Sequence, residues 1–294
     1  MVPRLIAVVG PTATGKSALG LALARHLDGE IVNADAMALY RGLDIGTAKP
    51  TPAERTAVPH HLLDVLDVTE TASVAAYQRD ARAAIEALLA AGRTPVLVGG
   101  SGLYVQSVVD ELEFPGTDPA LRAELETELA AHGPAALHAR LAAVDPAAAD
   151  VVLPGNGRRI VRALEVIALT GKPFPARLPD AAVPRYDARL LGVDRPTDEL
   201  DVRVARRVAR MFAAGIVEEA RGLVRLRDGL TASRALGYQQ ILAGGEMTTA
   251  AADTVRATRR FVRRQRSWFR RDRRVHWLDA AAPDLLDRAL ALSS

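Results

Sequence analysis

Residues 10–17 read Gly10-Pro11-Thr12-Ala13-Thr14-Gly15-Lys16-Ser17. Two glycines bracket a six-residue span and a Lys-Ser pair follows, which is typical of a loop that cradles phosphates with its backbone N–H groups. The apolar run Leu5–Val9 predicts a buried strand before the loop, and Ser17–Leu27 predicts an amphipathic helix after it. The order strand, loop, helix predicts a site for a diphosphate or triphosphate, with the Ser17 hydroxyl available to Mg²⁺. A glycine turn without a ligand is the alternative.

The use of lysine supports this interpretation. The chain has 38 basic residues, and only Lys16, Lys49 and Lys172 among them are lysines. Arginine is used everywhere else, so the retention of Lys16 inside the glycine loop indicates that a compact ammonium is needed there. The loop itself does not identify the molecule that carries the phosphates.

Length and composition limit the class of protein. With 294 residues, of which 49% are hydrophobic and 25% charged, the chain suits one large domain or a core with an inserted lobe. It contains no cysteine, which excludes disulfides and thiolate metal sites. No stretch of about 20 apolar residues offers a membrane span, and the net charge is +3. We therefore expect a cytoplasmic protein without membrane contact.

Two further polar groups follow predicted strands. Asp35 comes just after the strand Glu30–Asn33, and Ser101 lies in a second glycine junction after the strand Thr94–Val98. Ligands of open α/β sheets bind beyond the C-terminal strand ends, so Asp35 should face the same cleft as the phosphate loop. An aspartate here also suits a helix N-cap or a turn, and the residues alone leave both open. The hydroxyl of Ser101 could close over a ligand.

The predicted secondary structure changes near Pro115, where strand-like segments end and helical segments begin. Helices separated by proline and glycine are predicted over Pro119–His132, Pro134–Val144 and Gly157–Gly171. We therefore predict an α/β fold with a parallel sheet, formed by residues 1–114 and 187–294. Residues 115–186 form an inserted all-helical lobe in this prediction, and the second part of the core carries basic C-terminal helices.

Arginines are distributed unevenly. Residues 256–274 contain ten arginines and one acid, so this segment lacks internal partners for its charge and a polyanion-binding face is predicted. In the helical lobe, arginines either meet phosphates or form a solvated helix surface. His60 and His61 should point to opposite faces of a strand, which argues against a shared metal ion.

Taken in chain order, several motifs resemble the bacterial tRNA dimethylallyltransferase family. They are the phosphate loop, Asn33–Asp35, Asp44-Ile-Gly-Thr-Ala-Lys-Pro50, Gly99–Tyr104, Arg159–Glu165, Gly237-Tyr238 and Thr258–Trp268. The resemblance covers nearly the whole chain and implies a P-loop core whose inserted lobe grips the anticodon stem-loop. It also implies transfer of the dimethylallyl group of dimethylallyl diphosphate to N6 of adenosine 37 in tRNAs that read codons beginning with U. A monomer suffices for such a partner.

The resemblance also implies site residues. The catalytic residues would be Lys16, Asp35 as general base, and Ser101. Diphosphate would bind to Gly10, Pro11, Thr12, Ala13, Thr14, Gly15, Lys16, Ser17 and Arg234, with Mg²⁺ on Ser17. Transfer RNA would contact Asp35, Ala36, Met37, Ala38, Ser101, Arg122, Arg158, Arg159, Ile160, Val161 and Arg162.

This chain departs from the family pattern at a few positions. Ala36 and Ala38 stand where the family commonly has Ser and Gln, and Gln239 stands where Arg is frequent. Base recognition is therefore expected to be looser. Two rival functions stay open: a P-loop kinase that uses ATP on a small molecule, and a non-catalytic RNA-binding protein whose loop senses a nucleotide.

Overall fold

The computed structural model describes residues 3–176 and 184–293. The chain divides into two compact units. The core unit comprises residues 1–111 and 183–294, and the helical unit comprises residues 112–182. The predicted connector Lys172–Arg185 lies partly outside the described residues.

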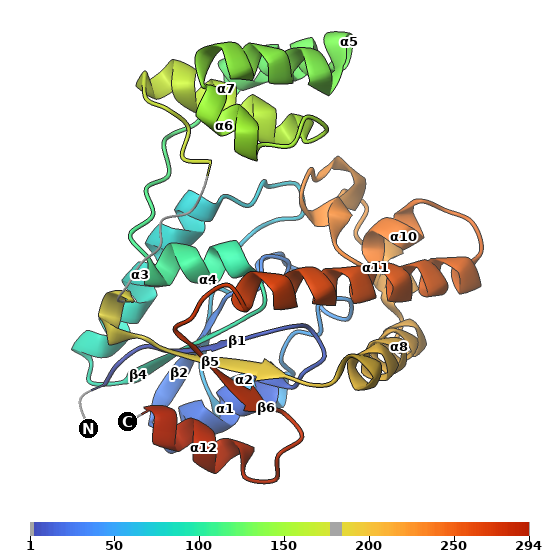
Figure 1. Ribbon diagram of the computed structural model, residues 1–294. Coiled ribbons are helices and arrows are strands. Elements are labelled where there is room, and N and C mark those ends of the chain that lie inside the picture. The colour runs from blue at the N-terminus through green and yellow to red at the C-terminus, as the bar shows by residue number, and fades with distance from the viewer. Residues whose placement is uncertain (1–2, 177–183, 294) are drawn as a thin grey trace. The chain divides into compact units, whose positions relative to one another are not determined.

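The core unit is built on a six-stranded sheet whose order is β3-β2-β4-β1-β5-β6 (Figure 1). All five pairings between neighbouring strands are parallel. The strands are β1 (Ile6–Val9), β2 (Gly29–Asn33), β3 (His60–His61), β4 (Thr94–Val98), β5 (Arg189–Asp194) and β6 (Val275–Asp279). The prediction of an α/β fold with a parallel sheet and a P-loop core is therefore confirmed.

Helices cover both faces of this sheet, because alternate side chains of the central strand β1 enter different cores. Leu5, Ala7 and Val9 pack with α3 and α4, whereas Ile6 and Val8 pack with α1 and α12. The helices of the core unit are α1 (Lys16–His26), α2 (Pro52–Ala57), α3 (Val74–Ala90), α4 (Gly102–Val109), α8 (Thr197–Ala213), α9 (Ile216–Gly222), α10 (Tyr238–Leu242), α11 (Met247–Phe269) and α12 (Leu285–Ser293).

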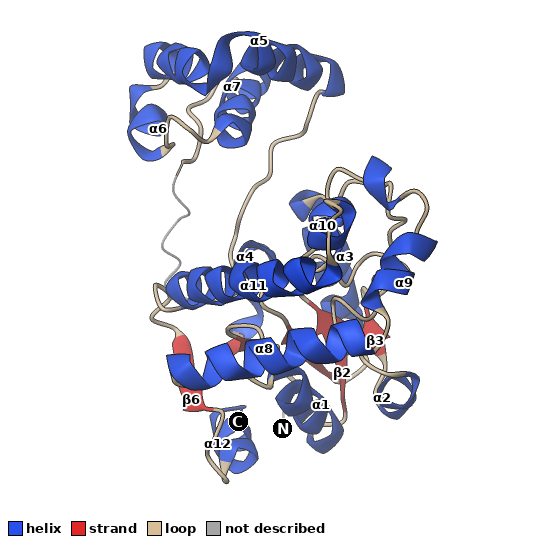
Figure 2. Ribbon diagram, turned by 90° about the vertical axis from the view of Figure 1, so that its right-hand side faces the viewer, coloured by secondary structure: helices blue, strands red, loops and turns tan. Residues whose placement is uncertain are grey.

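A third core lies beyond the strand ends. It joins Tyr40 and Leu43, in the loops after β2, to α8, α9 and α10 through Met211, Ile216 and Tyr238. In Figure 2, α8 and α11 run side by side across the core unit, and their contacts agree with that view. The loops after β1 and β2 are thus held between the sheet and these helices.

The helical unit contains α5 (Pro119–Val144), α6 (Pro146–Val151) and α7 (Gly157–Thr170). The two helices predicted within Pro119–Val144 meet at Gly133, which leaves helical geometry with a φ of 76° just before Pro134. The unit has its own apolar core, to which Leu125, Leu137 and Leu164 contribute. The short helix α6 was not predicted, because its alanine-rich sequence has no clear apolar period.

Candidate active site

The phosphate loop follows β1 and leads into α1. Gly10 has a φ of 131°, and a Cβ there would lie 2.3 Å from the carbonyl oxygen of Val193, so only glycine fits. Within the loop, the Lys16 ammonium and the Thr14 hydroxyl both donate to the Pro11 carbonyl, at 2.6 Å and 2.9 Å. No side chain caps the N-terminus of α1. Its free N–H groups and positive dipole end therefore suit an anion.

Two polar segments converge beside this loop from the ends of β2 and β4. The Ser101 hydroxyl accepts the backbone N–H of Ala36 at 3.1 Å, which fixes the segment next to Asp35. The Asp35 Oδ1 atom accepts the N–H of Met37 at 2.9 Å. Asp35 is thus a turn residue, and its Oδ2 atom makes no hydrogen bond among the described residues.

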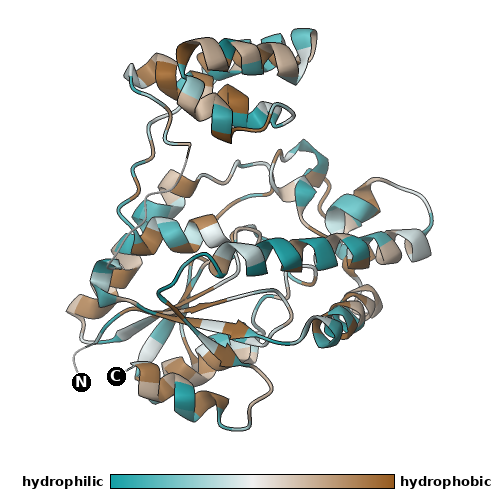
Figure 3. Cartoon of the chain, in the orientation of Figure 1, coloured by the Kyte–Doolittle hydropathy of each residue, from teal (hydrophilic) through white to brown (hydrophobic). Residues whose placement is uncertain are grey.

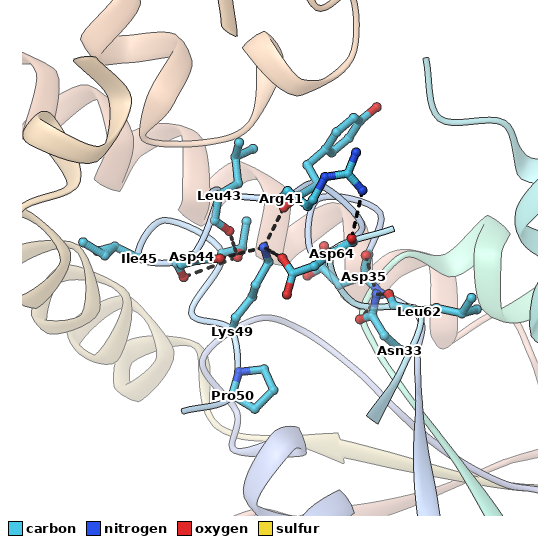
Figure 4. A network of polar contacts seen from close by, with 12 residues as sticks. Asn33, Asp35, Arg41, Leu43, Asp44, Ile45, Lys49, Pro50, Leu62 and Asp64 are labelled. Atoms are coloured by element: carbon cyan, nitrogen blue, oxygen red, sulfur yellow. Dashed lines mark hydrogen bonds and ion pairs between the residues drawn. The ribbon is translucent and has the colours of Figure 1, made fainter. Parts of the chain in front are cut away.

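Asn33 holds Asp35 from the strand side. Its Oδ1 atom accepts the backbone N–H of Asp35 at 3.0 Å, and its Nδ2 atom donates to the carbonyl oxygens of Asp35 and Leu62, each at 3.0 Å (Figure 4). The Asp35 carboxylate is therefore carried on a segment that is fixed from both sides, as a positioned general base requires.

Charge in the site centres on Lys16. Burial lowers the pKa of Lys16 to about 7, the carboxylate of Asp35 opposes this shift, and the positive charge of Arg207 adds to it. Burial also lowers the pKa of Arg207, again against the attraction of Asp35. Lys16, Asp35 and Arg207 therefore lie within electrostatic reach of one another, although they come from three distant parts of the chain.

Arg207 was not identified from the sequence as a site residue. It lies on α8, where Arg203 donates to the carbonyl of Ala13 at 2.7 Å and Arg207 donates to the carbonyl of Thr47 at 3.2 Å. That carbonyl is the only hydrogen-bond partner of the Arg207 guanidinium within the described residues. The sequence shows arginines at helical spacing here, at positions 203, 206, 207 and 210, but their spacing alone does not distinguish Arg207 from the others.

Gln265 of α11 links the phosphate loop to the glycine-rich segment after β4. It is buried, its Oε1 atom accepts the N–H of Thr12, and its Nε2 atom donates to the carbonyl of Gly100, each at 2.9 Å. The amide offers one donor and one acceptor in the required places, which a carboxylate cannot do. The N–H of Thr12 is thereby committed to Gln265 in this structure.

The Ser17 hydroxyl is a possible oxygen ligand for the expected magnesium ion. The Ser17 side chain is exposed in the first turn of α1, and its hydroxyl makes no hydrogen bond among the described residues. Mg²⁺ prefers hard oxygen ligands and commonly shares substrate phosphates with a few protein groups. No cluster of three or more His, Asp or Glu side chains that could hold a metal ion occurs in the described ranges.

The chain resembles known proteins over nearly its whole length. A family model described as IPP transferase matches residues 38–272. The tRNA dimethylallyltransferase of Streptomyces avermitilis is 66% identical, over 97% of this chain and 93% of the relative. The tRNA dimethylallyltransferase of Nocardia farcinica is 64% identical, over 98% of this chain and 94% of the relative. The chain belongs to the IPP transferase family.

Solved structures agree with this assignment. The tRNA isopentenylpyrophosphate transferase of Bacillus halodurans superposes with a TM-score of 0.71 and 37% identity, covering 99% of this chain and 94% of that one. A eukaryotic dimethylallyltransferase acting on tRNA superposes with a TM-score of 0.82 at 24% identity, covering 98% and 77%, which supports the fold. The family resemblance inferred from the motifs is therefore confirmed.

Arg234, the arginine assigned to diphosphate from the family motif, lies in a short helical turn before α10. Its side chain is exposed and makes no hydrogen bond or ion pair within the described residues. Arg207 of this IPP transferase is a further candidate for that role, because its positive charge contributes to lowering the pKa of Lys16. The diphosphate role of Arg234 stays a prediction.

The residues assigned to tRNA fall into two groups. Arg158 and Arg159 are exposed on α7, where a polyanion can reach them. Ile160, Val161 and Ala38 are buried at 0%, 3% and 5% exposure, so their side chains offer little surface to tRNA, and their assignment stays a prediction. Ile160 and Val161 pack into the apolar core of the helical unit, because one stripe of an amphipathic helix faces inward.

Arg122 and Arg162 have partners within the helical unit. Both donate to the carboxylate of Glu165, which is fully buried, at 2.5 Å and 2.7 Å. Arg162 also donates to the carbonyl oxygens of Pro115 and Gly116. These two arginines therefore hold the helical unit together, and contact with tRNA would use their remaining N–H groups.

The predicted absence of partners for the arginines of residues 256–274 is wrong. Asp201 pairs with Arg259 and Arg263, and Asp194 pairs with Arg266 and Arg270. Arg256 pairs with Asp253, and Arg274 pairs with both Asp110 and Asp272. Hydrophilic colouring still runs along much of α11 in Figure 3. Within the described residues, Arg260, Arg264, Arg271 and Arg273 have no carboxylate partner.

The adjacent histidines have separate structural roles. His61 contacts Glu30 at 2.5 Å, and the His60 ring lies 2.7 Å from the Val58 carbonyl.

In the ranges 3–176 and 184–293, none of the helices has both the length and the apolar character needed to cross a bilayer.

Proposed function

We propose that this protein transfers the dimethylallyl group of dimethylallyl diphosphate to N6 of adenosine 37 in tRNA. The observations that carry the proposal are the Lys16-containing phosphate loop at the start of α1 and the Asp35 segment that Asn33 and Ser101 hold at the ends of neighbouring strands. The electrostatic effect of Asp35 on Lys16 and Arg207 agrees with this arrangement. Lys16 and Arg207 both donate to neutral carbonyl groups, so within the described residues no carboxylate bonded to them competes with a diphosphate. A carboxylate beside a diphosphate site is the arrangement that a transfer with proton removal needs.

The chemistry assigns a role to each group. The bond between C1 of the dimethylallyl group and the diphosphate oxygen breaks, and the bond between C1 and N6 of adenosine forms. Loop N–H groups, Lys16 and Arg207 stabilise the negative charge that develops on the diphosphate. Ser17 would hold Mg²⁺ through its hydroxyl, and the ion would supply further positive charge to the diphosphate.

Asp35 accepts the proton that N6 loses. An adenine amine is a weak nucleophile because its lone pair is drawn into the ring, so a base must act as the new bond forms. Ser101 holds the backbone of Ala36 and thereby keeps Asp35 in place. Since N6 of a stacked base is hard to reach, the target nucleotide is flipped out of its stack.

The proposal extends to the partners. The anticodon stem-loop is the part of tRNA bound, Mg²⁺ accompanies the diphosphate, and the working unit is a monomer in the cytoplasm. The exposed Arg158 and Arg159 of α7 supply charge for RNA phosphates. The names of the relatives support tRNA as the substrate.

The test is a reaction with product identification. Purified protein is mixed with Mg²⁺, unmodified tRNA whose anticodon loop carries A36-A37-A38, and either dimethylallyl diphosphate or ATP, and the digested nucleosides are weighed. We expect an adenosine heavier by one dimethylallyl group, formed without ATP, and no product from a control tRNA with guanosine at position 37. Consumption of ATP without a modified adenosine would favour the kinase. Tight tRNA binding without any product would favour the non-catalytic RNA-binding protein.

A further inference from the structure

The loop of residues 44–49 reads Asp44-Ile45-Gly46-Thr47-Ala48-Lys49. Within the described residues it makes no hydrogen bond to the phosphate loop or to Asp35. Its one link to the site is the Thr47 carbonyl, which accepts a hydrogen bond from Arg207 at 3.2 Å. The position of that carbonyl therefore decides where the Arg207 guanidinium is held.

The start of the loop is anchored by two side chains from α9 and α10. The Glu219 carboxylate accepts the N–H groups of Asp44 and Ile45, at 3.2 Å and 3.1 Å. The Tyr238 hydroxyl accepts the N–H of Gly46 at 3.0 Å and itself donates to Glu219. Three successive backbone N–H groups are thus fixed immediately before Thr47.

The aromatic ring of Tyr238 adds a steric constraint. Tyr238 is fully buried, and a Cβ on Gly46 would lie 2.3 Å from its ring. Burial and the bond to Glu219 raise the pKa of the Tyr238 hydroxyl, which keeps it protonated as a donor. Glycine at position 46 allows the backbone to lie directly against the ring.

The end of the loop is anchored by Lys49. Its ammonium group donates to the Tyr40 carbonyl at 2.6 Å, to Asp44 at 2.7 Å and to Asp64 at 2.5 Å (Figure 4). An ammonium has three donors, so all three are used, and the side chain is only 2% exposed. This lysine is a structural clamp whose charge is neutralised by its own aspartates, unlike Lys16.

We propose that Glu219 and Tyr238 are positioning residues for Arg207, acting through the backbone of the 44–47 loop. The loop presents a fixed, neutral carbonyl to Arg207, which orients the guanidinium without cancelling its charge. A carboxylate in the same place would hold Arg207 equally well but would compete with the diphosphate. The inference rests on the proposed function, because that function gives Arg207 a diphosphate to bind.

The test compares Tyr238→Phe with a matched control. Tyr238→Phe keeps the buried ring and removes only the hydroxyl that links Gly46 to Glu219. Tyr40→Phe removes another buried tyrosine hydroxyl of the same core, which contacts Glu70 and Ala72 and not the 44–47 loop. Affinity for inorganic diphosphate in Mg²⁺ is measured by calorimetry, and the single-turnover transfer rate is measured separately.

We expect Tyr238→Phe to weaken diphosphate binding and transfer by about fivefold to twentyfold, the usual loss for one hydrogen bond in a buried network, with tRNA affinity and melting temperature close to wild type. Tyr40→Phe should change diphosphate affinity less than about twofold. In an Arg207→Gln background, Tyr238→Phe should have almost no further effect, because the two residues act on one interaction.

An equal loss from Tyr238→Phe with and without Arg207 would overturn the proposal, as would wild-type affinity in the single variant. Glu219→Gln offers a second variant should Tyr238→Phe fold poorly, and it must show the same dependence on Arg207. Diphosphate affinity can be measured whether or not the protein transfers the dimethylallyl group. Absence of transfer in the wild type would therefore contradict the proposed function, while the comparison of Tyr238→Phe with and without Arg207→Gln would still test this inference.

Discussion

Positive side chains are used differently in the two units of the molecule. In the active site of the core unit, Lys16 and Arg207 donate to carbonyl oxygens, and no carboxylate hydrogen-bonds to either of them within the described residues. In the helical unit, Arg122 and Arg162 converge on the buried Glu165. The cations of the proposed site are thus free of carboxylate partners, whereas the two arginines of the helical unit are neutralised by an internal carboxylate. The partner of an arginine, more than its exposure, indicates its role.

The largest expected effect comes from the one carboxylate left with a free oxygen in the active site. Asp35→Asn keeps an oxygen that can accept the N–H of Met37, so the turn should survive. It removes the base, and turnover should fall by a factor on the order of 10² to 10⁴. Steady-state rates and separate binding measurements for tRNA and inorganic diphosphate check this. Turnover within threefold of wild type would remove Asp35 from the role of base.

Arg207→Gln should have the next largest effect. Loss of the charge that faces Lys16 and Asp35 should lower turnover by a factor on the order of 10² and weaken diphosphate binding, while the melting temperature changes little. Arg210 lies one turn further along α8, is exposed and has no carboxylate partner in the described ranges. Arg210→Gln is therefore the matched control and should keep nearly full turnover. Equal losses in both variants would mean that general positive charge on α8, and not Arg207, supports the reaction.

Much of this site could be predicted from local sequence. Asp35 and Ser101 meet because β2 and β4 are parallel neighbours whose ends lie level, with Asn33 opposite Val98. Arg207 could not be singled out in the same way. Four arginines at positions 203, 206, 207 and 210 share one helix, and only the packing of α8 against the loops decides which of them faces Thr47.

Long-range pairing explains why the partners of the arginines in residues 256–274 were not predicted. Asp194 and Asp201 lie more than fifty residues from the arginines of α11 that they neutralise, so a local count of charges gave a surplus that the fold removes. The burial of Ile160 and Val161 was available from the sequence, because the apolar period of α7 places them on its inner face. Their assignment to tRNA followed from the family motif and not from this apolar period.

Glu165→Gln should act on stability and leave the chemistry of the core unit intact. The Glu165 carboxylate is fully buried and accepts Arg122, Arg162 and the N–H of Asp118. Replacing it by an amide should cost about 1.5–3 kcal/mol of local stability, the usual value for hydrogen bonds to a charged group. Hydrogen exchange of the amides in α5 and α7 measures this in the intact protein. Glu128→Gln, which breaks the more exposed pair with Arg140, is the control and should cost less than about 1 kcal/mol.

Acid should erase this difference between the wild type and Glu165→Gln. Burial alone would raise the pKa of Glu165, but the hydrogen bonds from Arg122 and Arg162 outweigh it and hold the pKa below the ordinary value of 4.5. The folded state therefore binds this proton less readily than the unfolded state. The stabilisation is complete above the unfolded pKa and is lost as the pH falls through the lower folded pKa.

Hydrogen exchange, corrected for the intrinsic pH dependence of the amides, should show the smallest effect of the series. The difference in protection of α7 between wild type and Glu165→Gln should be constant from about pH 7 to pH 5 and should shrink below about pH 4. The difference for Glu128→Gln should stay small throughout. A difference for Glu165→Gln that persists undiminished to pH 2 would mean that shape and packing at position 165, and not its charge, hold the two arginines. The comparison with the proposed site would then be wrong for the helical unit, because Arg122 and Arg162 would not depend on a charged partner there.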